Sequence, residues 1–260
     1  MKQNYFESTW SSIKQHQTPN WFKKAKFGIY AHWGIYSVPA AGPNVTWYPY
    51  WMYRPPSPQF DYHCKHYGHP SKFGYKDFIP MFTAEKFNAE EWADLYYRSG
   101  AKFAGPVAEH HDGFPMWNCS DTEWCASKMG PKKDIVGELA KAIRNKGMKY
   151  MVAMHHAENW FFFPHWNNDF DTSKKEYESL YGELHNLDLI GNQAVYPDHW
   201  GRKNEHQDKP SKAFHDRWLN RLKEVVDNYK PDYVWSVSYT HLRAHETKAN
   251  RVCRLLLEKK

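Results

Sequence analysis

Residues 101–117 read AKFAGPVAEHHDGFPMW, and this stretch decides the fold. Small and apolar residues at 103–108 predict a short, fully buried strand, and polar residues at 109–112 follow it directly before a turn at Gly113. In a parallel α/β barrel the functional groups lie at this end of the strands. A polar cluster of this kind can also serve only to hydrogen-bond the neighbouring loops.

Three further stretches predict strands of the same kind. Residues 27–34 read FGIYAHWG, which indicates a short buried strand that ends in a histidine. The apolar run at 149–154 ends in a histidine pair at 155–156, and a last strand begins at 232–235. Histidine therefore follows three of the four expected strands.

Helical patterns separate these strands. Asn88 and Glu91 form a capping signal, and Gly100 marks the end of the same helix. Two long stretches, 39–80 and 161–209, lack periodicity and are expected to be functional loops. The alternation of strands and helices predicts a parallel sheet of the α/β class. Helical patterns cover residues 5–26, 88–100, 134–147 and 211–230.

The composition favours a site for a small polar ligand. Aromatic residues make up 18% of the 260 residues, with 13 Trp and 18 Tyr. A chain of this length can bury a sizeable core. The excess of Trp, Tyr and His predicts a site for a polar, partly apolar ligand such as a sugar, although aromatic residues are also simply good packers.

The charge distribution and the cysteine spacing argue against several other classes of protein. Six basic and two acidic residues lie from Ser236 onward, which accounts for +4 of the net charge of +6 and leaves no basic footprint for nucleic acid elsewhere. No run of about 18 apolar residues predicts a membrane span, and residues 1–7 lack the apolar stretch of a signal peptide, so the localisation stays open. Cys64, Cys119 and Cys125 have no CxxC spacing, which argues against a disulfide framework and a zinc site.

Four motifs together carry a family resemblance that none of them carries alone. The chain resembles the α-L-fucosidases of glycoside hydrolase family 29 over roughly residues 7–235. The resemblance implies a (β/α)8 TIM-like barrel catalytic domain that is truncated here after about the fourth strand. The motifs are KFGIYAHWG at 26–34, WY at 47–48, EHHDGF at 109–114 and ENW at 158–160.

The last residues do not share this resemblance. Residues 237–247 read VSYTHLRAHET, which is what a common transposase sequencing adaptor gives when it is translated in one frame, and residues 252–260 match the far end of that adaptor. We therefore expect a partial barrel catalytic domain at 1–235 and a non-native tail at 236–260.

The resemblance implies retaining glycoside hydrolysis by double displacement, in which two carboxyl groups about 5–5.5 Å apart act as nucleophile and acid/base. The family places its nucleophilic aspartate two residues after a tryptophan at the end of such a strand. Trp235 stands at the matching place, but position 237 is Val237. In the family, the acid/base residue lies further along the sequence than the nucleophile. This chain is therefore predicted to lack both groups and to be inactive, whereas the complete protein would remove terminal α-L-fucose from fucosylated oligosaccharides or glycoconjugates.

The sugar-holding residues of the family have counterparts here. Either His155 or Met154 faces the substrate, because a shift of one residue in the strand register exchanges the two faces of the strand. Thr46 departs from the glutamate that many relatives carry, which would weaken sugar binding or shift its specificity. Glu109 is expected to orient a histidine or to pair in the barrel wall. The resemblance implies neither a cofactor nor a metal. The implied substrate-binding residues are His32, Trp47, His110, His111, His155 and Trp235.

Three alternatives remain. The first is a metal-dependent hydrolase built from residues 110–112 and 155–156, although adjacent histidines on a strand point to opposite faces, so each pair would supply one ligand. The second is a non-catalytic sugar-binding remnant. The third concerns this polypeptide alone, since half a barrel leaves an edge strand unpaired and would misfold or aggregate.

Overall fold

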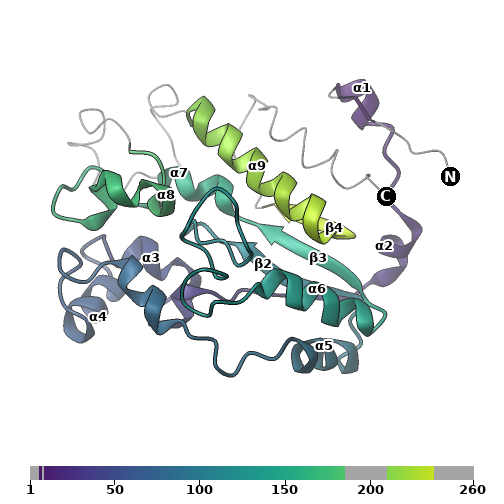
Figure 1. The fold of residues 1–260 in the computed structure, drawn as a ribbon, viewed down its shortest axis with the longest axis horizontal. Helices are drawn as coiled ribbons and strands as arrows, with labels where there is room; N and C mark the ends of the chain where they lie inside the picture. Colours follow the sequence, from purple (N-terminus) through teal and green to yellow (C-terminus); the bar gives the residue numbers. More distant parts are fainter. Residues whose placement is uncertain (1–5, 8, 185–209, 237–260) are drawn as a thin grey trace.

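The computed structural model describes residues 6–7, 9–184 and 210–236 and places a four-stranded parallel sheet at the centre. The strands are β1 (Gly28–Ala31), β2 (Phe103–Glu109), β3 (Lys149–Met154) and β4 (Tyr233–Ser236), and they lie side by side in chain order (Figure 1). The predicted α/β class is confirmed. Of the expected tail at 236–260, Ser236 is the last residue of β4, and residues 237–260 lie outside the described residues.

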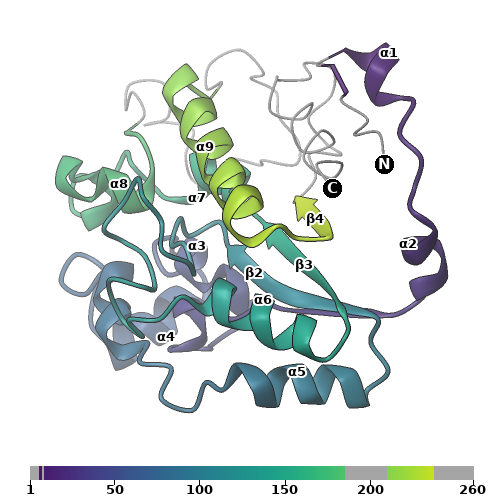
Figure 2. The ribbon, with the colours of Figure 1, turned by 45° about the vertical axis from the view of Figure 1, so that its right-hand side comes forward.

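Three long helices connect the strands. They are α5 (Ala89–Arg98), α6 (Ile135–Asn145) and α9 (Lys212–Tyr229), and all three were predicted. Each begins at a side chain that accepts a hydrogen bond from a backbone N–H of its first turn, and these caps are Asn88, Asp134 and Ser211. Helices α5 and α6 pack against each other beside the sheet (Figure 2).

The expected lead-in helix and first strand differ from the prediction. The segment 5–26 contains two short helices, α1 (Trp10–Ile13) and α2 (Asn20–Ala25), instead of a single one. Strand β1 is not buried, since Tyr30 is 41% exposed. The reason is its position: within the described part of the chain, β1 pairs on one side only, with β2.

The two expected loops hold local structure. Ser57 caps α4 through Phe60 N–H, and Pro58 occupies its first position, which is a local start signal that the sequence contained. Residues 185–209 of the second loop lie outside the described residues. The first loop contains η2 (Val45–Trp47), α3 (Tyr48–Trp51), α4 (Pro58–His66) and η3 (Tyr75–Met81), and η1 (Ile35–Ser37) precedes it. The second contains α7 (Asn159–Phe162), η5 (Asp171–Ser173), η6 (Lys175–Tyr177) and α8 (Glu178–Tyr181), and η4 (His156–Glu158) precedes it.

An irregularity in the sheet changes the direction of the chain at the end of β2. Val107 pairs with Ala153, but Glu109 pairs with Met154, so β2 carries one extra residue there. Such a bulge bends a strand and re-aims the side chains that follow it. Earlier in β2, a Cβ on Gly105 would lie 1.6 Å from the carbonyl oxygen of Met151, so the two backbones need glycine at this position.

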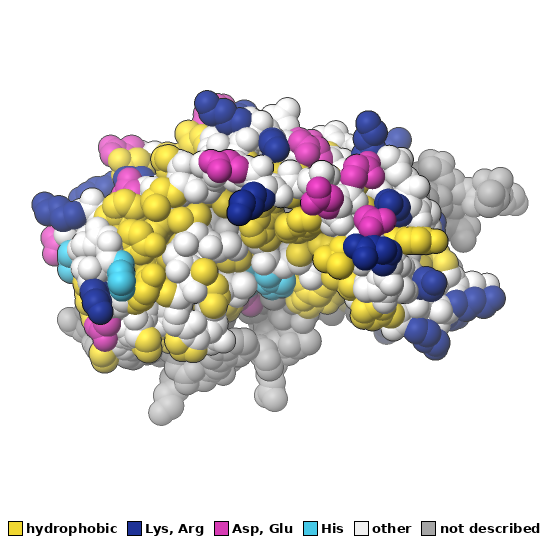
Figure 3. Space-filling model, turned by 90° about the horizontal axis from the view of Figure 1, so that it is seen from below, with side chains coloured by type: hydrophobic (Ala, Val, Ile, Leu, Met, Phe, Trp, Pro, Cys, Tyr) yellow, Lys and Arg dark blue, Asp and Glu magenta, His cyan; other side chains and the backbone are white. Residues whose placement is uncertain are grey.

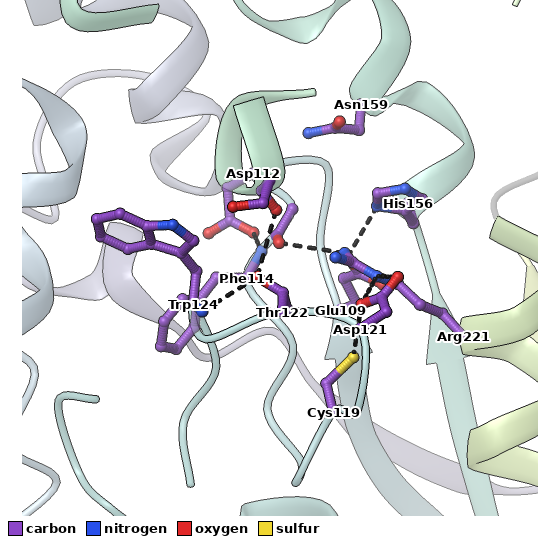
Figure 4. A network of polar contacts seen from close by, with 12 residues as sticks. Glu109, Asp112, Phe114, Cys119, Asp121, Thr122, Trp124, His156, Asn159 and Arg221 are labelled. Atoms are coloured by element: carbon purple, nitrogen blue, oxygen red, sulfur yellow. Dashed lines mark hydrogen bonds and ion pairs between the residues drawn. The ribbon is translucent and has the colours of Figure 1, made fainter. Parts of the chain in front are cut away.

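A buried ion-pair network ties the end of β2 to α9. Arg221 of α9 contacts Glu109 Oε1 through Nη1 and donates from Nε to Asp121 Oδ1 at 3.0 Å (Figure 4). Nδ1 of His156 lies 2.8 Å from the same Glu109 oxygen. Burial by itself would raise the pKa of Glu109, but the positive charge of Arg221 and the contact with His156 outweigh burial and lower it. Glu109 is therefore a buried carboxylate that depends on Arg221.

The surface carries scattered apolar side chains. Hydrophobic side chains form a broad band across the lower face, with charged side chains around it (Figure 3). Phe27 and Tyr30, at the exposed edge strand, are among the large hydrophobic residues that remain exposed. Among the described helices, none combines the length and the apolar character that crossing a membrane would require.

The network predicts how stability responds to mutation. Arg221→Met would leave the buried Glu109 charge without compensation and should lower the free energy of unfolding by about 3–5 kcal/mol. The double variant Glu109→Gln with Arg221→Met removes that charge and should recover a large part of the loss. Urea unfolding followed by tryptophan fluorescence measures both, together with the soluble yield.

Arg98→Met is the matched control, because Arg98 pairs with Asp94 at 2.7 Å on the exposed face of α5 and its loss should change little. A double variant as unstable as Arg221→Met would show that lost packing of the arginine, rather than an unpaired charge, causes the effect.

Candidate functional site

Four histidines from the ends of three neighbouring strands meet at one place. His32 follows β1, His110 and His111 follow β2, and His155 follows β3. The ring centre of His32 lies 5.4 Å from that of His110 and 5.1 Å from that of His155. The rings of His110 and His111 are 4.3 Å apart, and His155 lies 5.0 and 5.2 Å from them. These four residues are called the histidine cluster below.

Two tryptophans flank the histidine cluster. The ring of Trp47 lies 5.1 Å from His111, and the ring of Trp235, in β4, lies 5.2 Å from His155. All six residues predicted to bind substrate are thus brought together. Three of them, His110, His111 and His155, are buried, whereas His32 is exposed and both tryptophans are partly exposed.

The two histidine pairs behave differently, and the expectation of one inward histidine per pair is wrong for the first. His110 and His111 both join the cluster because β2 has already bulged and ended at Glu109, so strand alternation no longer applies to them. The second pair does separate. His155 enters the cluster, whereas His156 turns to the buried ion-pair network and stacks on Phe214 at 5.3 Å.

Backbone contacts hold His111 in place. Its Nδ1 lies 2.9 Å from the carbonyl oxygen of His155, and Asn159 donates a hydrogen bond of 2.9 Å to the carbonyl oxygen of His111. Oε2 of Glu158 lies 3.6 Å from Nε2 of His111. Sequence reasoning assigned no role to Asn159, although the ENW motif contains it, because nothing in a linear motif shows that its side chain supports another loop.

Burial keeps the inner histidines neutral. Desolvation lowers the pKa of His110 well below its usual value, and the neighbouring histidines lower it further. Desolvation is also the main cause that lowers the pKa of His155 to about 2, and His111 and His32 add to it. At neutral pH each ring therefore offers one N–H donor and one nitrogen acceptor. Among the described residues, Nδ1 of His110 and both ring nitrogens of His155 are buried without a hydrogen-bond partner.

Buried carboxyl groups lie beside the histidine cluster. Asp112 accepts a hydrogen bond of 2.7 Å from the Tyr75 hydroxyl, and burial raises its pKa to about 7 although this hydrogen bond opposes the shift. Glu109 pairs with Arg221 and contacts His156, in line with the two roles expected for it (Figure 4). Sequence reasoning missed Tyr75, since no pattern links residue 75 to residue 112.

The arrangement is suited to holding a polar ligand with several hydroxyl groups. Neutral imidazoles can donate to and accept from hydroxyls, and the two indole rings offer flat apolar surfaces at the side. The nitrogen atoms of His110, His111 and His155 also lie within 4.8 Å of one another, a spacing that a metal ion could bridge. This cluster therefore has two classes of candidate ligand, a sugar and a metal ion.

Comparisons with known proteins identify the family of the chain. The family model described as alpha-L-fucosidase matches residues 1–258. The human plasma alpha-L-fucosidase is 35% identical over 232 residues, and the rat tissue alpha-L-fucosidase is 32% identical over 234 residues. These matches cover 89% and 90% of this chain but 42% of each relative, so the chain spans less than half the length of these curated relatives.

Solved structures agree with these matches. The crystal structure of Thermotoga maritima alpha-fucosidase in complex with fucose is 31% identical, with a TM-score of 0.72, over 97% of this chain and 53% of that chain. The complex of the same enzyme with a mechanism-based inhibitor has a TM-score of 0.73 over 97% of this chain and 52% of that chain. The chain therefore belongs to the α-L-fucosidases of glycoside hydrolase family 29, and it matches the N-terminal part of its relatives.

Proposed function

We propose that the complete protein is a retaining α-L-fucosidase that removes terminal α-L-fucose from fucosylated oligosaccharides or glycoconjugates by double displacement. The observation that carries this proposal is the histidine cluster with Trp47 and Trp235 beside it. Family membership supports it, since the matched relatives are fucosidases and one solved relative holds fucose.

The cluster suits the chemistry of a deoxy sugar. L-Fucose presents hydroxyl groups on most of its ring and one apolar methyl group. The imidazole rings of His110, His111 and His155 would exchange hydrogen bonds with the hydroxyls, with His32 at the exposed side. Trp47 and Trp235 would pack against C–H groups and the methyl group.

We further propose that residues 1–235 form part of a (β/α)8 barrel. The strands follow one another in chain order, as they do around such a barrel, whereas doubly wound sheets reverse their order. Within the described residues, β1 and β4 each pair on one side only, so both edges can accept the strands that would close a barrel. The share of the relatives that the chain covers fits a partial barrel.

Catalysis requires groups that this chain does not provide at the expected place. By the family pattern the nucleophile stands two residues after Trp235, where the chain has Val237. Position 237 lies outside the described residues, and the acid/base would lie further along. The polypeptide of 260 residues would therefore hold the sugar-binding half of the site without the reacting carboxyl groups, and residues 236–260 would be a non-native tail.

Val237 also favours a second candidate, a sugar-binding remnant without hydrolytic activity. The two candidates predict the same cluster and differ in the natural residue at position 237. If the source DNA has an aspartate codon at position 237, the chain is a truncated hydrolase. If it has the same valine codon followed by the same tail, the chain is a remnant.

The first prediction from this proposed function concerns activity. The 260-residue chain should release no nitrophenol from p-nitrophenyl α-L-fucoside, because neither carboxyl group of the double displacement is available. The assay is paired with re-sequencing of the source DNA across the codon for Trp235. Measurable turnover by the purified chain would contradict the assignment of the nucleophile to the position of Val237.

The second prediction concerns binding by the chain itself. L-Fucose should bind and D-fucose should not, because the mirror-image sugar has the same polarity but cannot place its hydroxyls on the same nitrogens. Isothermal titration calorimetry with each enantiomer measures this. Equal binding of the two sugars would mean that the contact is non-specific.

The third prediction concerns His111 in a complete gene. His111→Ala should lower kcat/KM by an amount equivalent to about 1–3 kcal/mol, through an unpaired sugar hydroxyl. His111→Gln should retain more activity, since its amide can reach the place of Nε2. The exposed His66 of α4 supplies the control, and His66→Ala should leave kcat/KM unchanged. An unchanged kcat/KM in His111→Ala would remove this residue from the sugar site.

A further inference from the structure

The buried part of the histidine cluster has the composition of a metal site. The ligand nitrogens of His110, His111 and His155 lie within 4.8 Å of one another, and each of the three residues is at most 3% exposed. Three histidines with one position left open is a ligand set that Zn²⁺ uses in proteins. Imidazole also suits copper and nickel, whereas magnesium and calcium prefer oxygen ligands.

The nitrogens of two of these residues are available for coordination. Nδ1 of His110 and both ring nitrogens of His155 are buried and have no hydrogen-bond partner among the described residues. A buried nitrogen without a partner costs free energy, and a ligand that fills its coordination recovers that cost.

The third residue is oriented as metal-binding histidines usually are. Nδ1 of His111 faces the carbonyl oxygen of His155 at 2.9 Å, and since a carbonyl only accepts, Nδ1 carries the proton. Nε2 is then the nitrogen that holds the lone pair. A backbone carbonyl behind the ring is a common support for a ligating histidine, because it sets both the tautomer and the ring direction.

A carboxylate stands near the place where a cation would sit. Oε2 of Glu158 lies 3.6 Å from Nε2 of His111, and the Glu158 side chain is 26% exposed. Its negative charge would offset part of the charge that a divalent ion brings to three neutral ligands.

We propose that His110, His111 and His155 bind one divalent transition-metal ion of the Zn²⁺ type, and that this ion excludes the sugar. Metal binding follows from the three rings alone. The exclusion rests on the proposed function, because the nitrogens that would coordinate the ion are those that would meet the sugar hydroxyls. The ion is therefore an inhibitory ligand of the sugar site.

The test begins with the metal alone. The 260-residue chain, freed of metal with EDTA and dialysed, is titrated with Zn²⁺ by calorimetry and with Co²⁺ by visible absorption. We expect one site per chain and a cobalt spectrum of nitrogen ligands without the sulfur-to-cobalt charge-transfer band. A stoichiometry of zero, or a sulfur band that disappears in Cys64→Ser, would overturn the proposal.

Variants assign the site. His155→Ala should weaken Zn²⁺ binding by at least about tenfold, a loss that already follows from disturbing the residues around a metal ligand. His66→Ala is the matched control, since His66 is exposed on α4, and it should bind Zn²⁺ as the unchanged chain does. Circular dichroism establishes that both variants keep their secondary structure. Equal affinities in the two variants would overturn the assignment.

Competition separates this inference from the proposed function. L-Fucose added to the cobalt-loaded chain should reduce the cobalt absorption, and D-fucose should not. Binding of Co²⁺ at the cluster with no response to L-fucose would support the metal site and contradict both the exclusion and the sugar role. Binding of L-fucose without any binding of Zn²⁺ or Co²⁺ would contradict the metal site alone.

Discussion

The contact between Arg221 and Glu109 is the interaction on which the rest of the site depends. Glu109 is fully buried at the end of β2, and a carboxylate can remain ionised there only because a guanidinium lies against it. The same Arg221 reaches Asp121 beyond the next turn and the carbonyl oxygen of Gly113. One side chain of α9 therefore holds the chain segment that carries His110 and His111.

This dependence links the ion-pair network to the histidine cluster through two strands. His156 contacts Glu109 on the side of the network, while its neighbour His155 enters the histidine cluster. A displacement of α9 would thus move groups at the ends of both β2 and β3. The network and the cluster are carried by neighbouring residues at the same strand ends, so the network can hold the cluster in position.

The pKa values of the buried histidines in the cluster are lowered mainly by burial, and the crowding of several imidazoles adds to this effect. Bringing several imidazoles within about 5 Å of each other makes a proton on any one of them unfavourable, and desolvation acts in the same direction. His110 and His155 are therefore neutral rings, and each has one nitrogen lone pair and one N–H donor. The same neutrality suits sugar hydroxyls and transition-metal ions, which is why the two ligands would compete for one place.

Much of this arrangement could be predicted from local pattern. Helices α5, α6 and α9 were recognisable because Asn88, Asp134 and Ser211 satisfy backbone N–H groups only a few residues away, and such signals survive in a linear sequence. The strand ends carried histidine in a repeated position, and the resemblance to the α-L-fucosidases added Trp47 and Trp235 and nominated the six residues that meet in the structure. Their role in binding remains a prediction.

Only the tertiary structure decided the rest, because it depends on contacts between residues far apart in the chain. The bulge in β2 placed both His110 and His111 in the cluster, against the expectation from strand alternation. The partner of Glu109 lies 112 residues away and the partner of Tyr75 lies 37 residues away, distances at which no periodicity carries information. Exposure of β1 likewise follows from its place at the sheet edge, which the apolar content of residues 27–34 could not reveal.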